Sequence, residues 1–551
     1  MSLLNNKEPK RHEGVEVRLQ IFAVLLACAL GVLGLQLWRL QVVQSLEFQK
    51  EAEAQMIRPQ RLKSDRGIIY GAGDVILADN RASADIVFVP GDCTPVERLP
   101  HVCELLERLI GIDGKAVLDK SEAILGLKKG TNIAVAPFTQ LTVKQDVTMI
   151  DRVRVEEHSY DLPGVYTVVQ PQRRYHFGKT AGQILGYLGE INDTELERME
   201  GYQMGDIIGK SGVERMYEQS LQGKDGFMLV TKYASGRPQL LTDRFGTPYV
   251  AKRDSEGHVL TEVGERKEPK PGQPLHLTLD IKLQSFCEQL LQRRREGRED
   301  APAIGEIGAI VMLNADTGAV LALASNPTYD PSVFVTRGRG HERLELLQAP
   351  NPNPMRNRCY MEHYPPGSVY KVLMAAAALE TGKITRDTTF FCPGYFQIPG
   401  RRAHCHQRRG HGTVSIKEAL AYSCDVYFYN VGLRLGIDNM AEWSHKLGIG
   451  EQTGIDLPGE LPGNMPTKEK KAERFKDKPE WDQRWFDGDT INVSIGQGGL
   501  TTTPLQNAVL MASIINGGHR VTPYLNADLP PSPSSQLLSD KTVQIIQEAM
   551  Q

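Results

Sequence analysis

The segment HYPPGSVYKVLMAAAALE, residues 363–380, places a hydroxyl and an amine three positions apart at the front of an apolar run. The preceding Pro-Pro-Gly cannot continue a helix, and it therefore predicts the turn that leads into one. Ser368 and Lys371 then lie one turn apart on the same face of that helix. The helix dipole favours negative charge on Ser368, and the apolar surroundings desolvate Lys371 and favour its neutral form. This is the arrangement of an activated nucleophile, although so short a pattern also arises by chance.

A second polar group lies in the segment AYSCDVYFYN, where Ser423 follows Ser368 by fifty-five residues. Ser423 and Asp425 stand among apolar and aromatic residues, where a hydroxyl and a carboxylate are costly to bury unless they are hydrogen-bonded. One interpretation is a helix N-cap, since Ser and Asp are good capping residues. The other is a proton relay, in which Ser423 protonates a leaving amine and Asp425 contacts Lys371 or the substrate.

The N-terminal region predicts a membrane anchor. Twenty uncharged residues, LQIFAVLLACALGVLGLQLW, lie between Arg18 and Arg39, which is long enough to span a hydrocarbon layer of about 30 Å. A signal peptide is the alternative, but its apolar stretch is usually shorter and ends in a small-residue cleavage site. Basic residues precede the run, so residues 1–18 are expected to be a cytoplasmic tail, 19–38 the anchor, and the rest outside the cytoplasm. The net charge of −3 argues against a nucleic-acid partner.

The remaining chain is long enough for several folding units and reads as an α+β multidomain protein. Two β-hairpins are predicted, one about Gly71-Ala72-Gly73 and one about Asp316-Thr317-Gly318. We expect a β-rich pedestal over residues 41–250, a charged Pro/Gly-containing linker over 251–274, and a C-terminal domain over 275–551.

Three longer segments carry a resemblance to a known family. Ser368-x-x-Lys371 followed by a Ser-x-Asn-like triplet resembles the penicillin-recognising serine acyltransferases. The segment SDRGIIYGAGDVILADN is similar to an Arg-Gly-x-Ile-x-Asp-x-x-Gly motif of one class of these proteins, with Gly71 in place of Asp. Two other segments of that class are similar to GKSGVERMYEQSLQG and SIGQGGLTTTPLQNA. On these segments the chain is identified as a member of the class B penicillin-binding proteins, over nearly its whole length. Asp425 in place of Asn points to the elongation branch found in Gram-negative rods.

The resemblance implies a penicillin-binding, β-lactamase-like transpeptidase domain with helices around an antiparallel sheet. It implies a D,D-transpeptidase in which neutral Lys371 takes the proton of Ser368, which attacks a D-Ala-D-Ala stem peptide. Ser423 then protonates the departing D-Ala, the amine of a second stem peptide attacks the acyl-enzyme, and β-lactams acylate Ser368. The implied location is the inner membrane with the bulk of the chain periplasmic, and the implied partners are a RodA-type glycan polymerase and other rod-complex proteins. The alternatives are a D,D-carboxypeptidase or β-lactamase-like hydrolase, and a catalytically impaired membrane scaffold or β-lactam sensor.

Three cysteines and one histidine predict a zinc site. Three thiols and an imidazole match a closed tetrahedral structural site, although their spacing is not that of a standard zinc finger. Members similar to this branch carry zinc at the corresponding positions, often with acidic residues at the first two. Because the last cysteine lies inside the Ser-x-Asp triplet, the metal would brace Ser423 and Asp425. His404 and His406 are rival ligands, and the predicted set is Cys392, Cys405, His411 and Cys424.

One family element was not found. The resemblance requires a Lys-Thr-Gly motif on an edge strand, which binds the substrate carboxylate and whose strand completes the oxyanion hole. Lys210-Ser211-Gly212 belongs to an upstream motif, and Lys179-Thr180-Ala181 has the wrong third residue. The printed chain ends within SDKTVQIIQEAMQ, so we expect the domain to lack its last two or three strands and this exact chain to be poorly active. Cys93 and Cys103 are close enough in sequence for a disulfide, a question that the sequence leaves open.

Overall fold

The computed structural model describes residues 13–44, 57–93, 95–127, 140–203, 205–232, 238–239, 241–242, 248–253, 259–263, 266–292, 307–336, 338–529 and 535–551. The chain divides into two compact units. Unit 1 comprises Met1–Lys63, Ala84–Val168 and Asp225–Pro269, and unit 2 comprises Ser64–Ser83, Val169–Lys224 and Lys270–Gln551. Each unit is therefore assembled from segments that lie far apart in the sequence.

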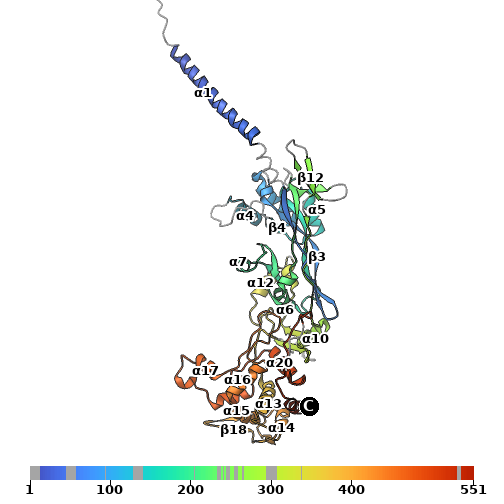
Figure 1. Ribbon diagram of the computed structural model, residues 1–551, viewed down its shortest axis with the longest axis vertical. Helices are drawn as coiled ribbons and strands as arrows, with labels where there is room; N and C mark the ends of the chain where they lie inside the picture. Colours follow the sequence, from blue (N-terminus) through green and yellow to red (C-terminus); the bar gives the residue numbers. More distant parts are fainter. Residues whose placement is uncertain are drawn as a thin grey trace, which may run out of the picture. The chain divides into compact units, whose positions relative to one another are not determined.

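The N-terminal region forms the predicted apolar helix. Helix α1 (Glu13–Trp38; Figure 1) continues into the π-helical turn η1 (Arg39–Val43). The side chains from Arg18 onward are exposed. Within the described ranges, the stretch Arg18–Val43 is the one helix that is both long and apolar enough to cross a membrane. Exposed leucine, valine and phenylalanine side chains on all faces of a helix are typical of a segment surrounded by lipid.

Unit 1 consists of antiparallel strands and helices. Strand β1 (Ile57–Leu62) pairs with β8 (Gly226–Lys232), and β4 (Leu141–Lys144) pairs with the end of β3 (Val75–Phe88). An apolar cluster lies under three helices and includes Cys93 and Cys103. Both cysteines are buried free thiols, so the structure has no disulfide between them. The helices are α3 (Leu99–Ile110), α4 (Gly114–Ile124) and α5 (Met149–Glu157).

The predicted linker, residues 251–274, holds several strands of unit 1. Strand β10 (Leu241–Thr242), β11 (Pro248–Arg253) and β12 (Val259–Val263) form a three-stranded antiparallel sheet. Strands β9 (Pro238–Gln239) and β13 (Arg266–Lys267) pair with β8. The high charge and the prolines favoured a linker in the sequence, but an antiparallel sheet with one solvated face tolerates charged residues as well.

The N-terminal part of unit 2 contains the first predicted hairpin. Strand β2 (Ile69–Gly71) pairs antiparallel with β3, which confirms the turn about Gly71-Ala72-Gly73, and β14 (Leu275–His276) pairs parallel with β2. Gly73 has a positive φ of 72°, a conformation that glycine adopts without strain. The segment also includes β5 (Val165–Tyr175), α6 (Gly182–Leu185), β6 (Leu188–Glu190), α7 (Asp193–Leu196), β7 (Ile207–Gly209), α8 (Gly212–Met216) and α9 (Glu218–Leu221).

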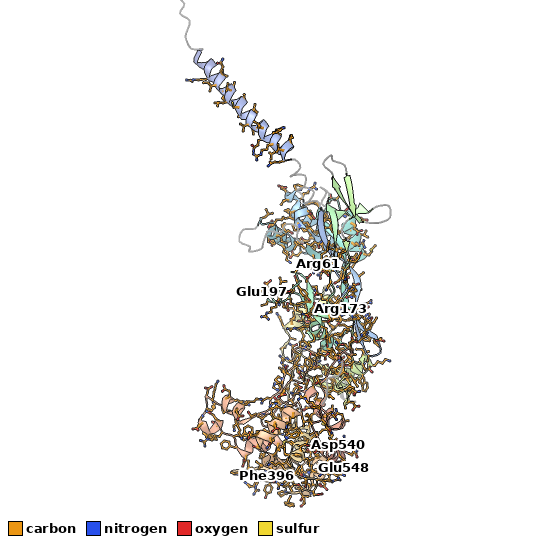
Figure 2. The ribbon with its side chains drawn as sticks, in the orientation of Figure 1. Arg61, Arg173, Glu197, Phe396, Asp540 and Glu548 are labelled. Carbon is orange, nitrogen blue, oxygen red and sulfur yellow. The ribbon has the colours of Figure 1, made fainter. Side chains whose placement is uncertain are left out.

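A buried charge network joins three of these segments. The Glu214 carboxylate, which is fully buried, accepts from Arg66 Nε at 2.6 Å and from Arg173 Nε at 2.7 Å (Arg173 is labelled in Figure 2). Arg66 also donates to Glu218 Oε2 at 2.6 Å. Two motifs used for the family resemblance, SDRGIIYG and GKSGVE, therefore meet in space through Arg66 and Glu214.

The second predicted hairpin forms the sheet of the C-terminal domain. Strands β15 (Gly308–Leu313) and β16 (Val320–Asn326) pair antiparallel, which confirms the turn about Asp316-Thr317-Gly318. Helix α10 (Ile281–Gln292) contacts β16, and α20 (Pro504–Ile515) contacts β15. Short helices α11 (Ser332–Val335) and α12 (Gly340–Leu347) follow the hairpin. Helices around an antiparallel sheet were the expected architecture of this domain.

A larger apolar core lies among the helices around α13 (Tyr370–Glu380). Figure 1 labels α13 among these helices. Residues Leu373–Ala378 of α13 are fully buried, because this helix is surrounded by others. Two small hairpins, β17–β20 and β18–β19, lie beside α15. The surrounding elements are β17 (Phe390–Cys392), β18 (Tyr395–Ile398), β19 (Arg401–His404), β20 (Gly412–Val414), α14 (Ile416–Ala421), α15 (Asp425–Leu435), α16 (Ile437–Lys446), α17 (Lys468–Arg474), α18 (Glu480–Gln483), α19 (Asp487–Ser494) and α21 (Asp540–Met550).

Candidate active site

Ser368 lies in a short 3₁₀ turn, η4 (Gly367–Val369), that leads directly into α13. The turn is held by the glycine-rich segment SIGQGG, because the Gly367 N–H donates to the Gly496 carbonyl oxygen at 3.0 Å. A Cβ atom at position 496 would lie only 2.1 Å from the Gly367 oxygen. Glycine is therefore required at 496 for the two backbones to approach this closely. The predicted Pro-Pro-Gly lead-in is present, and the SIGQGG segment fixes its position.

Lys371 extends from the first turn of α13 and is buried to 1% exposure. Its Nζ donates to the Ser423 carbonyl oxygen at 2.9 Å, to Ser423 Oγ at 3.1 Å and to Asp425 Oδ1 at 2.6 Å. An ammonium group has three N–H donors, so these three acceptors satisfy it completely. The structure therefore brings Lys371, Ser423 and Asp425 together, and of the two contacts considered for Asp425 it shows the one with Lys371.

Ser423 is the link between the amine and the nucleophile. Its backbone has a φ of 52°, in the left-handed region that non-glycine residues rarely adopt. The turn is closed by hydrogen bonds from the Ser423 N–H to Leu420 O at 3.1 Å and from the Cys424 N–H to Ala419 O at 2.8 Å. In this conformation the Ser423 hydroxyl donates to Ser368 Oγ at 2.9 Å. Backbone strain at this position is thus associated with the contact between the two serines.

The contact between Lys371 and Ser368 differs from the direct one that the sequence suggested. Among the hydrogen bonds of the described residues, none joins these two side chains, and Lys371 reaches Ser368 through Ser423. The reason is electrostatic, because the Asp425 carboxylate at 2.6 Å holds the amine on the side of α15. The hydrogen bonds form a chain in which the amine, the Ser423 hydroxyl and the nucleophile follow one another.

Asp425 is the first residue of α15, and the structure does not use it as a helix cap. The N-cap residue of this helix is Cys424, and it makes no side-chain cap hydrogen bond. Asp425 instead contacts Lys371 through Oδ1 and accepts the His406 N–H at 2.9 Å through Oδ2. Both carboxylate oxygens are therefore occupied, which fixes the orientation of the side chain.

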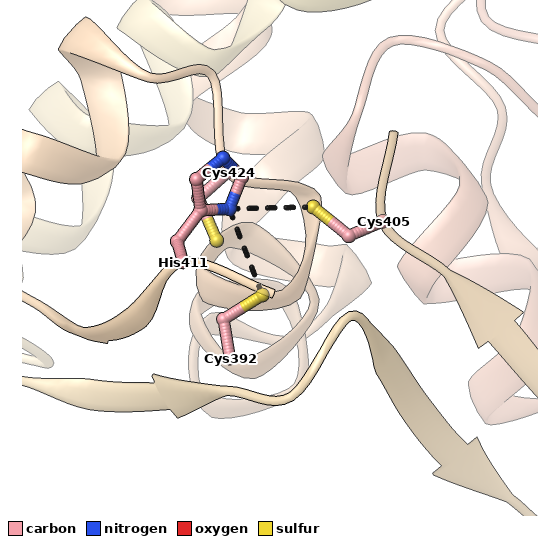
Figure 3. Close-up of side chains that lie close together, drawn as sticks. All are labelled: Cys392, Cys405, His411 and Cys424. Carbon is pink, nitrogen blue, oxygen red and sulfur yellow. Dashed lines mark hydrogen bonds between the residues drawn. The ribbon is translucent and has the colours of Figure 1, made fainter. Parts of the chain in front are cut away.

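The four predicted zinc ligands lie together (Figure 3). Cys424 stands between Ser423 and Asp425 in the sequence, so the group adjoins this chain of hydrogen bonds. The ligand atoms of Cys392, Cys405, His411 and Cys424 all lie within 4.8 Å of one another. His411 Nδ1 is 3.7 Å from Cys392 Sγ and 3.6 Å from Cys405 Sγ. Tetrahedral zinc, with bonds of about 2.3 Å to sulfur and 2.0–2.1 Å to nitrogen, separates its sulfur and nitrogen ligands by about 3.6 Å. The donor set and its spacing therefore fit zinc.

Two glycines allow the backbone to close around this cluster. A Cβ at Gly394 would lie 2.1 Å from the Arg408 oxygen, and one at Gly410 would lie 2.2 Å from the Cys392 oxygen. The close approach permits the Cys405 N–H to donate to Gly394 O at 3.0 Å and the His411 N–H to donate to Cys392 O at 3.1 Å. The loops after β17 and β19 thereby converge on the start of α15, which carries Cys424.

The rival histidines take other positions. His404 is not among the clustered ligand atoms, and its carbonyl oxygen accepts from the Tyr429 hydroxyl at 3.3 Å. The His406 ring is more than half exposed, with Nδ1 3.9 Å from Cys405 Sγ and 3.6 Å from Asp425 Oδ2. It belongs to a smaller group with those two residues. The geometry favours His411 as the nitrogen ligand.

A hydrogen bond couples two of the clustered thiols, Cys405 and Cys424. The hydrogen bond with Cys424 lowers the pKa of Cys405 to about 4, although burial acts in the opposite direction. The same bond, together with burial, raises the pKa of Cys424 far above its ordinary value. Zinc binds the thiolate form of cysteine, and the lowered pKa of Cys405 favours that form.

Two contributors to this site were missed at the level of sequence. The His406 backbone N–H positions Asp425, and the SIGQGG segment positions the turn at Ser368. A backbone donor has no sequence signature. The glycine run of SIGQGG was a usable signal, because clustered glycines indicate a close backbone approach.

Comparisons with known proteins place this fold and site in one class. Residues 308–551 match the family "Penicillin binding protein transpeptidase domain", and residues 61–277 match "Penicillin-binding Protein dimerisation domain". Together with the serine-lysine-serine arrangement, they define a class B penicillin-binding protein, as the sequence predicted.

Among the relatives, "Peptidoglycan D,D-transpeptidase MrdA" of Escherichia coli strain K12 is 34% identical over 503 residues, 90% of this chain and 71% of that protein. The protein of the same name from Acinetobacter baumannii is 34% identical over 509 residues, 92% of this chain and 68% of that protein. A solved complex of penicillin-binding protein 2 and MreC from Helicobacter pylori aligns with a TM-score of 0.72 at 25% identity, covering 90% of this chain and 83% of that chain. The chain belongs to the MrdA family, which is penicillin-binding protein 2.

Proposed function

We propose that this chain cross-links peptidoglycan stem peptides as a D,D-transpeptidase, through a serine acyl-enzyme at Ser368. The observation that carries the proposal is the continuous hydrogen-bonded chain from Lys371 through Ser423 to Ser368. An exposed hydroxyl, a buried amine and an intervening hydroxyl are the parts that acyl transfer needs. The MrdA relatives, which carry the name of this activity, support the same assignment.

The proton path follows from the contacts. As Ser368 Oγ attacks the carbonyl carbon between the two D-Ala residues, its proton passes to Ser423 Oγ. The proton of Ser423 passes in turn to Lys371 Nζ. For this step the amine must have one proton fewer than the three-donor ammonium described above, and both hydroxyls must turn so that Ser368 donates to Ser423 and Ser423 donates to Lys371. When the C–N bond breaks, Lys371 returns a proton through Ser423 to the departing D-Ala nitrogen. The amine of a second stem peptide then attacks the ester and releases Ser368, and a β-lactam would acylate Ser368 in the same way.

Zinc is proposed as a structural component beside this path. Cys392, Cys405, His411 and Cys424 would hold it, and the metal when bound would supply a rigid tetrahedral cross-link. Cys424 stands between Ser423 and Asp425, and Cys405 precedes the residue whose N–H holds Asp425. The metal-bound residues would therefore hold Ser423 and Asp425 within hydrogen-bonding distance of Lys371.

The cellular setting is proposed on the N-terminal helix and on the relatives. The basic residues before Arg18–Val43 favour a cytoplasmic N-terminus and a periplasmic remainder, tethered by one span of the inner membrane. The solved H. pylori relative is in complex with MreC, and another neighbour belongs to a peptidoglycan synthase complex. A glycan polymerase of the RodA type and rod-complex proteins are the proposed partners.

Covalent labelling with a fluorescent penicillin tests the proposal. The full chain in detergent should acquire one label on Ser368, and Ser368→Ala should acquire none. Ser423→Ala should label about 100-fold more slowly, because it removes the relay. Ser220→Ala, an exposed serine on α9, is the matched control and should label normally. Equal labelling of wild type and Ser368→Ala would overturn the assignment of the nucleophile. An acceptor amine added to an unlabelled donor peptide then separates transfer from hydrolysis.

A further inference from the structure

A strongly basic surface lies next to the candidate active site. Between Asp387 and Glu418 the sequence contains no acidic residue, although the whole chain has a net charge of −3. We call residues 395–411 the basic hairpin; it comprises β18, β19 and the loop that leads to His411. Four arginines lie in this hairpin, Arg401, Arg402, Arg408 and Arg409.

Three charges of the basic hairpin are exposed and have no counter-charge among the described residues. Arg402, Arg408 and Arg409 are exposed, and none of the three has an ion pair among the described residues. Arg402 stacks on the Tyr395 ring at 4.5 Å and donates to Gln397 Oε1 at 3.2 Å, contacts that orient the guanidinium without neutralising it.

The neighbouring carboxylates are already engaged. Asp425 is occupied by Lys371 and by the His406 N–H. Glu418 is held by the backbone and side chain of Ser415 in a capping box. The positive potential of the basic hairpin is therefore available to a ligand from outside the chain.

A chain of covalent and hydrogen bonds connects the basic hairpin to the nucleophile. Arg408 is two residues from His406, a span of at most about 7 Å along the backbone. From the His406 N–H, hydrogen bonds lead through Asp425, Lys371 and Ser423 to Ser368, each between 2.6 and 3.1 Å long. A peptide of a few residues bound at Arg408 thus reaches the neighbourhood of Ser368.

We propose that the basic hairpin binds the carboxylates of the acceptor stem peptide, whose amine attacks the acyl-enzyme. The inference rests on the proposed transpeptidase function and names the site of its second substrate. Stem peptides carry free carboxylates, and arginine binds a carboxylate with two parallel hydrogen bonds. A surface of guanidinium groups attracts the carboxylates of the acceptor and leaves its amine, which it repels, free to point toward the ester.

Direct binding tests this without requiring turnover. The probe is a fluorescein-labelled stem tetrapeptide with free carboxylates, titrated with the full chain and followed by anisotropy. Arg408→Gln/Arg409→Gln should weaken binding about 10-fold, and the same peptide with amidated carboxylates should bind the wild type about 10-fold more weakly. The matched control Arg152→Gln/Arg484→Gln removes two exposed arginines elsewhere and should leave binding unchanged. Binding should also weaken as salt is raised.

The outcomes separate this inference from the proposed function. Penicillin labelling reports the nucleophile alone, so the Arg408→Gln/Arg409→Gln variant should label at the wild-type rate. Unlabelled wild type would overturn the proposed function, whereas equal peptide binding by the variant, or equal binding of the amidated peptide, would overturn the acceptor site. If the Arg408→Gln/Arg409→Gln variant loses binding to vesicles containing anionic lipid while its peptide binding is unchanged, the basic hairpin contacts a membrane surface. That result would also overturn the acceptor site. Arg402→Gln, on β19 and away from the metal-binding loop, should weaken peptide binding about threefold. It is a second test that does not depend on the fold of that loop.

Discussion

Replacing Gly496 with alanine tests whether the SIGQGG segment positions the nucleophile. The new Cβ would lie 2.1 Å from the Gly367 oxygen and 2.6 Å from its nitrogen, and real Cβ contacts do not fall below 3.0 Å. The two backbones must therefore separate by about 1 Å. Gly367 immediately precedes Ser368, so the displacement is transmitted to the nucleophile.

The magnitude has a stability component and a kinetic component. The left-handed backbone at Gly496, with φ at 76°, costs about 1–2 kcal/mol for alanine. Separation of the backbones also removes the Gly367–Gly496 hydrogen bond of 3.0 Å, which contributes about 1 kcal/mol. We expect a loss of about 2–3 kcal/mol in the free energy of unfolding. A misplacement of Ser368 by about 1 Å should slow acylation about 100-fold.

The assay is the rate of single-turnover labelling with a fluorescent penicillin, measured beside urea unfolding. Gly382→Ala is the matched control, because Gly382 also has a positive φ of 66° but a Cβ there meets nothing within 4 Å. It should lose about 1–2 kcal/mol and label at the wild-type rate. If Gly496→Ala labels as fast as Gly382→Ala, the SIGQGG segment does not position Ser368, and the reasoning is wrong.

Three further outcomes are expected. Glu214→Gln should lower the free energy of unfolding by about 3–5 kcal/mol in urea titrations, because it removes the buried counter-charge of Arg66 and Arg173. Burial opposes ionisation of Glu214, but the two guanidinium groups hold its pKa below the ordinary 4.5. Its stabilising contribution should therefore persist at neutral pH and be lost on acidification through the folded-state pKa. Equal acid midpoints for unfolding of the wild type and Glu214→Gln would contradict this. The purified chain should contain one zinc per molecule by elemental analysis, and Cys392→Ser should lose the metal and unfold at a lower temperature. Burial raises the pKa of Cys93 to about 11 and that of Cys103 to about 12, so both thiols should resist alkylation at pH 8 and react after denaturation; failure of the denatured chain to react would show that the two are paired as a disulfide and contradict this.

The sequence predicted well those features that local chemistry determines. The two hairpins followed from turn residues between β-branched runs, and the apolar helix followed from twenty uncharged residues. The sequence placed Ser423 in a proton relay and Asp425 against Lys371 or the substrate because buried polar groups need partners, and in the structure both side chains contact Lys371. Arguments from residue type therefore identified the participants of the site.

The relations between distant segments were beyond such arguments. The left-handed backbone of Ser423 has no signature, since glycine or asparagine is the usual residue there. The choice of His411 over His404 and His406 as the nitrogen ligand depends on how the loop closes at Gly394 and Gly410. The helical spacing between Ser368 and Lys371 could not reveal that Asp425 draws the amine away from Ser368. The strands within 251–274 were missed because charge and proline content are shared by linkers and exposed strands.

The interleaving of the two units has a practical consequence for producing soluble fragments. A fragment that starts at residue 270 keeps Leu275 and Leu505 but discards Ile69, Leu77 and Val213, which belong to the same apolar cluster, and it should precipitate. Lys224 and Lys270 exchange backbone hydrogen bonds of 2.8 and 2.7 Å as an antiparallel bridge. The ends of the segment 225–269 therefore lie side by side, and a two-residue Asn-Gly turn could join them in a smaller protein for crystallisation that retains the apolar cluster of unit 2.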